Sequence, residues 1–160
     1  MAEPSEAEPS FSESAEVDAG VYVDSSALAK LYVPEDESDR LESFLHRRRD
    51  LMISELAITE VLSAVARKRR DGELQSNQAN RIRDALLTDA QSGAFKRLDL
   101  DPSVHREAER LLFATDAVSL RTLDALHIAL AFSGAATHMV TFDRRMAEAA
   151  AQTGLRVVTV

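Results

Sequence analysis

Short apolar segments alternate with helical patterns along most of the chain. The apolar segments predict strands at residues 21–24, 51–54, 95–100, 138–142 and 157–160. The patterns between them predict helices at residues 25–33, 36–49, 56–70, 75–92, 122–132 and 144–153, with one more that starts at Asp101-Pro102. This alternation is typical of an α/β fold with a mainly parallel sheet covered by helices. Right-handed crossovers then bring the carboxyl ends of the strands to one edge, where we expect any ligand site.

Four acidic residues interrupt this apolar pattern. Asp24 and Asp143 end apolar runs, whereas Glu60 and Asp124 fall within the apolar faces of two predicted helices. A carboxylate in apolar surroundings costs several kcal/mol unless something compensates it. A divalent cation would offset that cost and the mutual repulsion of the acids. Because the set consists of oxygen ligands and the chain has no cysteine, it favours Mg²⁺ or Mn²⁺ over zinc.

Each acid also has an explanation that needs no metal. Asp24 and Asp143 could each cap the helix that follows, a role that Asp fills well. Glu60 could bury its stem and extend its carboxylate into water. Asp124 could form an ion pair with Arg121, which lies three residues earlier in the chain.

Three neighbouring polar residues have supporting or structural interpretations. Ser26 could orient a nearby carboxylate, and Thr141 could hydrogen-bond a water bound to a metal. His127 lies three residues after Asp124. Such a histidine is more often a satisfied core residue than a ligand, so we do not count it as catalytic.

The net charge of −8 is unevenly distributed. Residues 1–20 contain six acids and no lysine or arginine, which leaves 21 acids against 19 bases in residues 21–160. The composition of residues 1–19 predicts a disordered acidic tail, followed by one folded domain over residues 20–160. Basic clusters at 47–49 and 67–70 could attract a polyanion.

Several classes of protein are disfavoured by the composition. No apolar run reaches the ~20 residues of a membrane span, and no secretory signal is visible at the N-terminus. The absence of cysteine excludes disulfides and thiolate metal sites. We therefore expect a cytoplasmic protein with no membrane partner.

Four segments of the chain together resemble the motifs of PIN-domain ribonucleases, and most closely the VapC-type toxins of bacterial and archaeal toxin–antitoxin pairs. These segments are Val21–Leu28, Ile58–Val61, Leu120–Ala129 and Val140–Arg145. The resemblance covers about residues 21–160, and the segment around Asp124 is its most specific part.

The resemblance implies a PIN-like three-layer α/β/α fold and an endoribonuclease that hydrolyses RNA phosphodiester bonds with Mg²⁺ or Mn²⁺. It places Asp24, Glu60, Asp124 and Asp143 at the four acidic positions, and Thr141 where a hydroxyl often supports the metal site. It further implies a homodimer and a cognate antitoxin that blocks the active site.

Two other functions compete with this hypothesis. An aspartyl-phosphate phosphotransferase would require a second Asp two residues after the first strand's Asp, and Ser26 occupies that position. A binding module without catalysis could instead use the acidic pocket to pair with arginines of a partner, and this alternative remains open.

Overall fold

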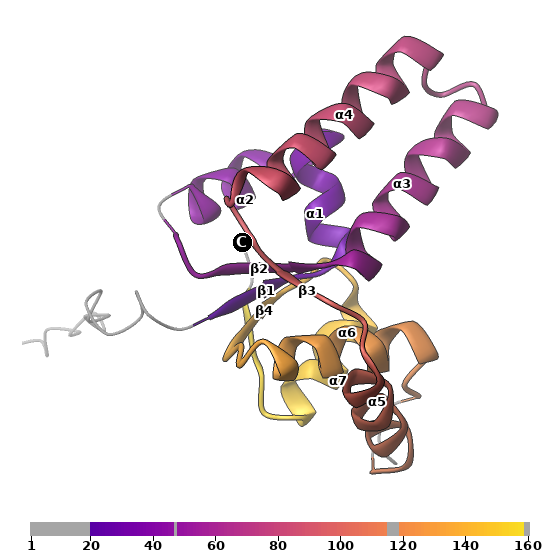
Figure 1. Cartoon of the computed structure of the whole chain (residues 1–160). Coiled ribbons are helices and arrows are strands. Elements are labelled where there is room, and N and C mark those ends of the chain that lie inside the picture. The colour runs from indigo at the N-terminus through magenta and orange to yellow at the C-terminus, as the bar shows by residue number, and fades with distance from the viewer. Residues whose placement is uncertain (1–19, 47, 115–118, 159–160) are drawn as a thin grey trace, which may run out of the picture.

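The chain forms three layers, with a parallel sheet between two layers of helices (Figure 1). The computed structural model describes residues 20–46, 48–114 and 119–158, so the predicted tail at 1–19 lies outside the described part. The strands are β1 (Val21–Val23), β2 (Leu51–Ser54), β3 (Lys96–Leu98), β4 (His138–Val140) and β5 (Arg156–Val158). All strand pairs are parallel, in the order β3-β2-β1-β4-β5. The predicted fold class is confirmed.

One helical layer comes from the first half of the chain and the other from the second half. The first layer contains α1 (Ser25–Tyr32), α2 (Ser38–Leu45), α3 (Glu55–Arg70) and α4 (Ser76–Ser92). The second contains α5 (Pro102–Ala114), α6 (Thr122–Ser133) and α7 (Arg144–Gln152). The long α3 and α4 run side by side and extend beyond the sheet (Figure 1).

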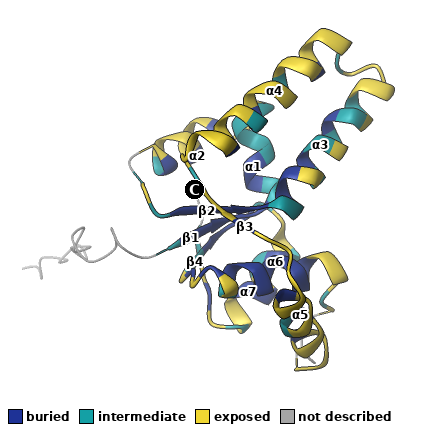
Figure 2. Cartoon of the chain, in the orientation of Figure 1, coloured by how far each residue is buried: buried dark blue, intermediate teal, exposed yellow. Residues whose placement is uncertain are grey.

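The central strand β1 is buried on both faces, as a parallel sheet between helices requires. Val21 and Val23 pack into the core beneath α1–α4, whereas Tyr22 points into the core beneath α5–α7. All three residues are fully buried. Figure 2 shows the same arrangement, with the buried β1 and β2 between helices whose outer faces are exposed, whereas β3 at the edge of the sheet is largely exposed.

The strand order reverses direction beside β1. From β1 the chain moves outward to β2 and β3, then returns to place β4 on the other side of β1. Val23 pairs with Val140 in this register, so β1 and β4 end together. Crevices at such reversal points are the preferred ligand sites of open α/β sheets. Asp24 and Asp143 follow these two strand ends.

The predicted elements are all present, but several are shorter than expected. The helix predicted at 36–49 is wrong at both ends, because α2 covers only Ser38–Leu45. Glu37 has φ of 72°, a left-handed conformation that no helix interior accepts. The strand predicted at 138–142 ends at Val140, because the Phe142 N–H donates to the Ser26 side chain instead of a strand.

Two other strands, β3 and β5, also begin or end at slightly different residues from those predicted. The strand predicted at 95–100 covers Lys96–Leu98, and that predicted at 157–160 is Arg156–Val158 within the described residues. None of the described helices combines the length and apolar character needed to cross a membrane.

Candidate active site

All four acids predicted from the sequence line one cavity of roughly 400 Å³ at the carboxyl edge of the sheet. They come from four separate places in the fold: the end of β1, helix α3, helix α6 and the segment between β4 and α7. The remaining lining residues are Ser25, Ser26, Arg121, Thr122, Leu123, His127 and Met146. The fold therefore gathers acidic side chains that are as much as 119 positions apart in the chain.

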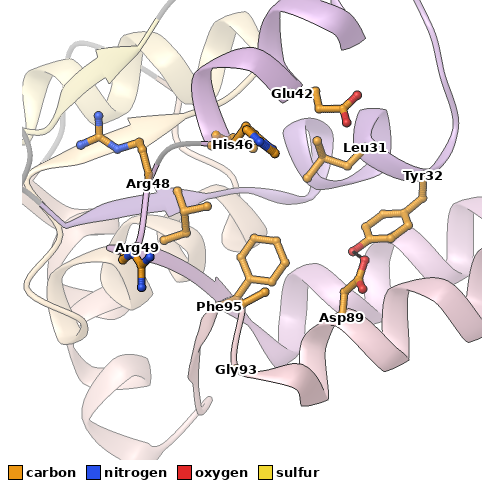
Figure 3. Close-up of a pocket in the computed structure, with 12 residues that line it drawn as sticks. Leu31, Tyr32, Glu42, His46, Arg48, Arg49, Asp89, Gly93 and Phe95 are labelled. Carbon is orange, nitrogen blue, oxygen red and sulfur yellow. Dashed lines mark hydrogen bonds between the residues drawn. The ribbon is translucent and has the colours of Figure 1, made fainter.

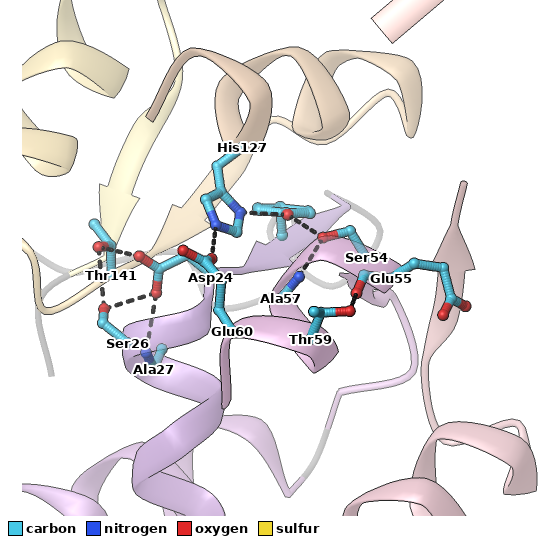
Figure 4. A network of polar contacts seen from close by, with 11 residues as sticks. Asp24, Ser26, Ala27, Ser54, Glu55, Ala57, Thr59, Glu60, His127 and Thr141 are labelled. Atoms are coloured by element: carbon cyan, nitrogen blue, oxygen red, sulfur yellow. Dashed lines mark hydrogen bonds and ion pairs between the residues drawn. The ribbon is translucent and has the colours of Figure 1, made fainter. Parts of the chain in front are cut away.

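Asp24 is the most constrained of the four. Its side chain caps α1 by accepting the Ala27 N–H on Oδ1 at 2.9 Å. Oδ1 also accepts the Ser26 hydroxyl at 2.8 Å, and Oδ2 accepts the Thr141 hydroxyl at 2.6 Å (Figure 4). Burial raises the pKa of Asp24, against the opposing effect of these three hydrogen bonds. The alternative role as a helix cap is thus correct, and it coexists with a place in the cavity.

Thr141 joins the two acids at the strand ends. Besides donating to Asp24, its Oγ1 accepts the Asp143 N–H at 3.1 Å. Asp143 is exposed and caps α7 through the N–H groups of Arg145 at 2.8 Å and Met146 at 3.2 Å. The structure thus gives Thr141 a direct hydrogen bond to a carboxylate, and its expected contact with a water bound to a metal stays a prediction.

Glu60 is held by a residue that the sequence interpretation had set aside. Its Oε2 lies 2.6 Å from Nε2 of His127 on α6, which is 1% exposed (Figure 4). Burial alone would raise the pKa of Glu60, but hydrogen bonds and charge from His127, with a hydrogen bond from Ser25, hold that pKa below its ordinary value. Glu60 is half-buried and does not simply extend into water.

Asp124 is buried at the third position of α6. Its Oδ2 accepts the Arg121 backbone N–H at 3.3 Å, which satisfies a free amide at the helix N-terminus. Among the described residues, no ion pair joins the Arg121 guanidinium to Asp124. The competing explanation of Asp124 as half of such an ion pair is therefore not supported.

The four acids suit a divalent ion that keeps several water ligands better than an ion whose ligands all come from the protein. Within the described ranges, no three acidic or histidine side chains are grouped closely enough to hold a metal directly. Hydrogen bonds to helix amides and to His127 occupy part of their acceptor capacity. Mg²⁺ keeps several waters and often uses only one or two carboxylates together with substrate phosphates. Oxygen donors around a cavity of this size suit that mode of binding.

A larger cavity of about 630 Å³ lies beside the amino ends of β2 and β3 (Figure 3). Its lining is partly polar and partly apolar, and it includes a hydrogen bond of 2.9 Å from the Tyr32 hydroxyl to Asp89. None of the four predicted acids lines it. Substitutions of residues that line this second cavity can therefore serve as control variants for substitutions in the acidic cavity.

Sequence reasoning missed Tyr22 and Ser54 as neighbours of the site and treated His127 only as a core residue. Tyr22 connects Ser54 to His127 through hydrogen bonds of 2.7 Å on each side. The available signals were a tyrosine in an otherwise aliphatic strand and a histidine one turn after Asp124. Neither signal indicates which partner the side chain will find.

Known proteins are similar to this chain over nearly its whole length. The PIN domain family matches residues 21–152. Ribonuclease VapC46 of Mycobacterium tuberculosis is 35% identical over 142 residues, which cover 88% of this chain and 97% of the relative. Ribonuclease VapC3 of Pyrobaculum aerophilum is 33% identical over 130 residues, covering 79% and 91%.

A solved structure with a similar fold is a toxin–antitoxin complex from Klebsiella pneumoniae. The alignment covers 88% of this chain and 97% of that chain, with a TM-score of 0.61 and 18% identity. At this level of identity the likeness concerns the fold alone, and it agrees with the three layers described above.

Proposed function

This chain belongs to the PIN-domain family, among its VapC ribonucleases, and on that premise we propose that it is a metal-dependent endoribonuclease. Asp24, Glu60, Asp124 and Asp143 would form the catalytic set and hold Mg²⁺ or Mn²⁺. The observation that carries this proposal is the single cavity lined by all four acids, at the point where the strand order reverses.

The side chains around Asp24 prepare it for this role. Within the described part of the chain, three hydrogen-bond donors fix the plane of this carboxylate and occupy three of about four lone-pair directions. One direction remains for a ligand in the cavity. A bound divalent ion would activate water for attack on phosphorus and stabilise the leaving oxygen. The chain itself would orient the carboxylates and keep their hydrogen bonds unchanged during the reaction.

A groove next to the acidic cavity carries three basic side chains that support a polyanionic substrate. The groove has a volume of about 520 Å³, and its charged lining residues are Lys30, Arg67 and Lys68, with Glu35 and Glu37. Ser26 lines both the groove and the acidic cavity, so the two are adjacent. Lys68 pairs with the exposed Glu73, and such a solvent-exposed pair is weak enough to exchange for a phosphate. The Lys30 side chain is only 12% exposed and pairs with Glu35 and Glu37 inside the groove. If an RNA backbone lay in this groove, the phosphate that follows the bound segment would lie at the acidic cavity.

The biological role that we propose is that of the toxin in a type II toxin–antitoxin pair, acting in the cytoplasm. The similarity to VapC ribonucleases supports this role. A cognate antitoxin would block the acidic cavity, and a second copy of the chain would form a homodimer.

A non-catalytic binding module is the alternative favoured by one observation. In the described part of the chain, no three candidate ligands are close enough to hold a metal without rearrangement. In that case the acids would pair with arginines of a partner and would not bind Mn²⁺. Calorimetric titration of the full chain with Mn²⁺ separates the two functions, because only the nuclease binds the ion at millimolar concentration.

The decisive experiment is RNA cleavage by purified Asp124→Asn protein in the presence of Mn²⁺. We expect cleavage to fall to background while circular dichroism shows an intact fold. Asp89→Asn is the matched control, because Asp89 lines the other cavity, and it should cleave like the wild type. Full cleavage by the Asp124→Asn variant, free of host nuclease, would refute the proposed function.

A further inference from the structure

A line of hydrogen bonds runs through the core and both begins and ends on α3 (Figure 4). The Ala57 N–H donates to Ser54 Oγ over 3.0 Å. Ser54 Oγ lies 2.7 Å from Tyr22 Oη, which lies 2.7 Å from His127 Nδ1. His127 Nε2 then meets Glu60 Oε2 at 2.6 Å. Glu60 is thereby connected to β1, to α6 and to the start of its own helix.

The two ends of this line have fixed donors. An ionised Glu60 has no hydrogen to donate, so Nε2 of His127 donates to it. At the other end the Ala57 N–H donates to Ser54 Oγ. Tyr22 Oη lies between Ser54 Oγ and His127 Nδ1, so its single hydroxyl hydrogen bonds one of these atoms and its oxygen accepts from the other.

The groups that form this line have little freedom to move. Tyr22 and Ser54 are fully buried, and His127 is 1% exposed. They belong to β1, to the N-cap of α3 and to α6, so three elements fix the plane of the imidazole. The Glu60 side chain, by contrast, is 26% exposed. It has several rotatable bonds, and a rigid partner therefore decides its direction.

We propose that Ser54, Tyr22 and His127 are positioning residues that hold the Glu60 carboxylate toward the acidic cavity and thereby set the affinity for the divalent ion. This inference rests on the proposed function. Partners that hydrogen-bond a metal ligand orient it, and their loss typically weakens metal binding ~10–100-fold. The line passes through the interior and needs no contact with RNA, so its effect should appear in metal binding itself.

The first test compares two tyrosine variants by calorimetric titration of the full chain with Mn²⁺. Tyr22→Phe removes the hydroxyl that anchors His127, and we expect Mn²⁺ affinity to fall about tenfold. Tyr32→Phe is the matched control, because its hydroxyl bonds Asp89 in the other cavity. That control should bind Mn²⁺ like the wild type. Equal affinity of Tyr22→Phe and the wild type would overturn the inference.

Two variants of His127 test its hydrogen bonds to Tyr22 and to Glu60 separately. They replace the first test if Tyr22→Phe does not fold. His127→Gln keeps an amide donor near the position of Nε2 but loses the ring nitrogen that bonds Tyr22. His127→Asn keeps a polar amide near the position of Nδ1 but loses the donor to Glu60. Both should weaken Mn²⁺ binding. An Asn variant that binds Mn²⁺ as tightly as the wild type would contradict the proposal, since it has no group that reaches Glu60.

A double-mutant cycle distinguishes positioning from general loosening of the fold. In the Glu60→Ala background there is no carboxylate to orient, so adding Tyr22→Phe should not weaken Mn²⁺ binding further. The same tenfold loss in both backgrounds would show that Tyr22 acts on the fold and not through Glu60. Wild-type protein that fails to bind Mn²⁺ would refute the metal site and this inference with it, whereas the outcomes above test positioning alone.

Discussion

The Thr141 hydroxyl donates a hydrogen bond of 2.6 Å to Oδ2 of Asp24, across 117 positions of sequence. The same oxygen of Thr141 accepts the Asp143 N–H. One hydroxyl therefore fixes the carboxylate after β1 and the backbone after β4, on the two sides of the point where the strand order reverses. The geometry of the acidic cavity depends on this bridge.

Removal of the Thr141 hydroxyl should harm both stability and activity. Thr141→Val keeps the shape of the side chain but leaves the buried Asp24 with one donor fewer, at a cost of about 1–3 kcal/mol. We expect that loss in urea unfolding, together with slower RNA cleavage. Thr141→Ser restores the hydroxyl and should recover most of both. A Val variant with wild-type stability would show that the bridge contributes nothing.

Asp24→Asn should make the protein more stable above the native pKa of Asp24 in metal-free buffer. Burial raises that pKa, so the native state binds the proton more tightly than the unfolded chain, whose Asp titrates near ~3.9. Wild-type stability is therefore highest, as far as Asp24 is concerned, below the unfolded value. It falls as the pH rises through the native pKa.

The measurement is urea unfolding in EDTA at a series of pH values for both proteins. Asn does not titrate, so the stability difference between variant and wild type should grow across this pH window and then level off. An Asn variant that is less stable than the wild type at neutral pH would contradict the prediction.

Mn²⁺ should stabilise the wild type against heat. An ion present at a hundred times its dissociation constant adds about 2.7 kcal/mol, or roughly 5–10 °C in melting temperature for a chain of this size. Scanning calorimetry with Mn²⁺ and with EDTA measures the shift. Asp124→Asn should lose most of the shift and Asp89→Asn should retain it. An equal shift in both variants would place the bound ion elsewhere.

A core substitution far from the cavity should change stability without changing metal binding. Leu86 on α4 is fully buried, and Leu86→Ala should cost about 2–5 kcal/mol. The neighbouring Leu87 is only partly buried, so Leu87→Ala should cost clearly less. Both variants, measured below their unfolding transitions, should bind Mn²⁺ like the wild type. A weakened affinity in Leu86→Ala would mean that overall stability controls the site.

Most secondary structure could be predicted because burial is periodic within each element. The alternation of apolar segments and helical patterns predicted each strand and helix of the described chain, with errors at their ends. The helix predicted at 36–49 began too early, because Glu37, the residue before α2, takes a left-handed conformation. That conformation depends on the local path of the chain, and the hydrophobic pattern does not encode it.

The sequence by itself determined where the acids occur: two after apolar strands and two on apolar helical faces. It also determined that Asp24 and Asp143 can cap helices, because capping is local. Only the tertiary structure decided that the four line one cavity, that Glu60 binds His127, and that Thr141 binds Asp24. The physical reason is that the spacing of residues in the sequence shows only which side chains share one face of a single helix or strand. Distances between elements, and the side-chain rotamers they permit, follow from how the layers pack together.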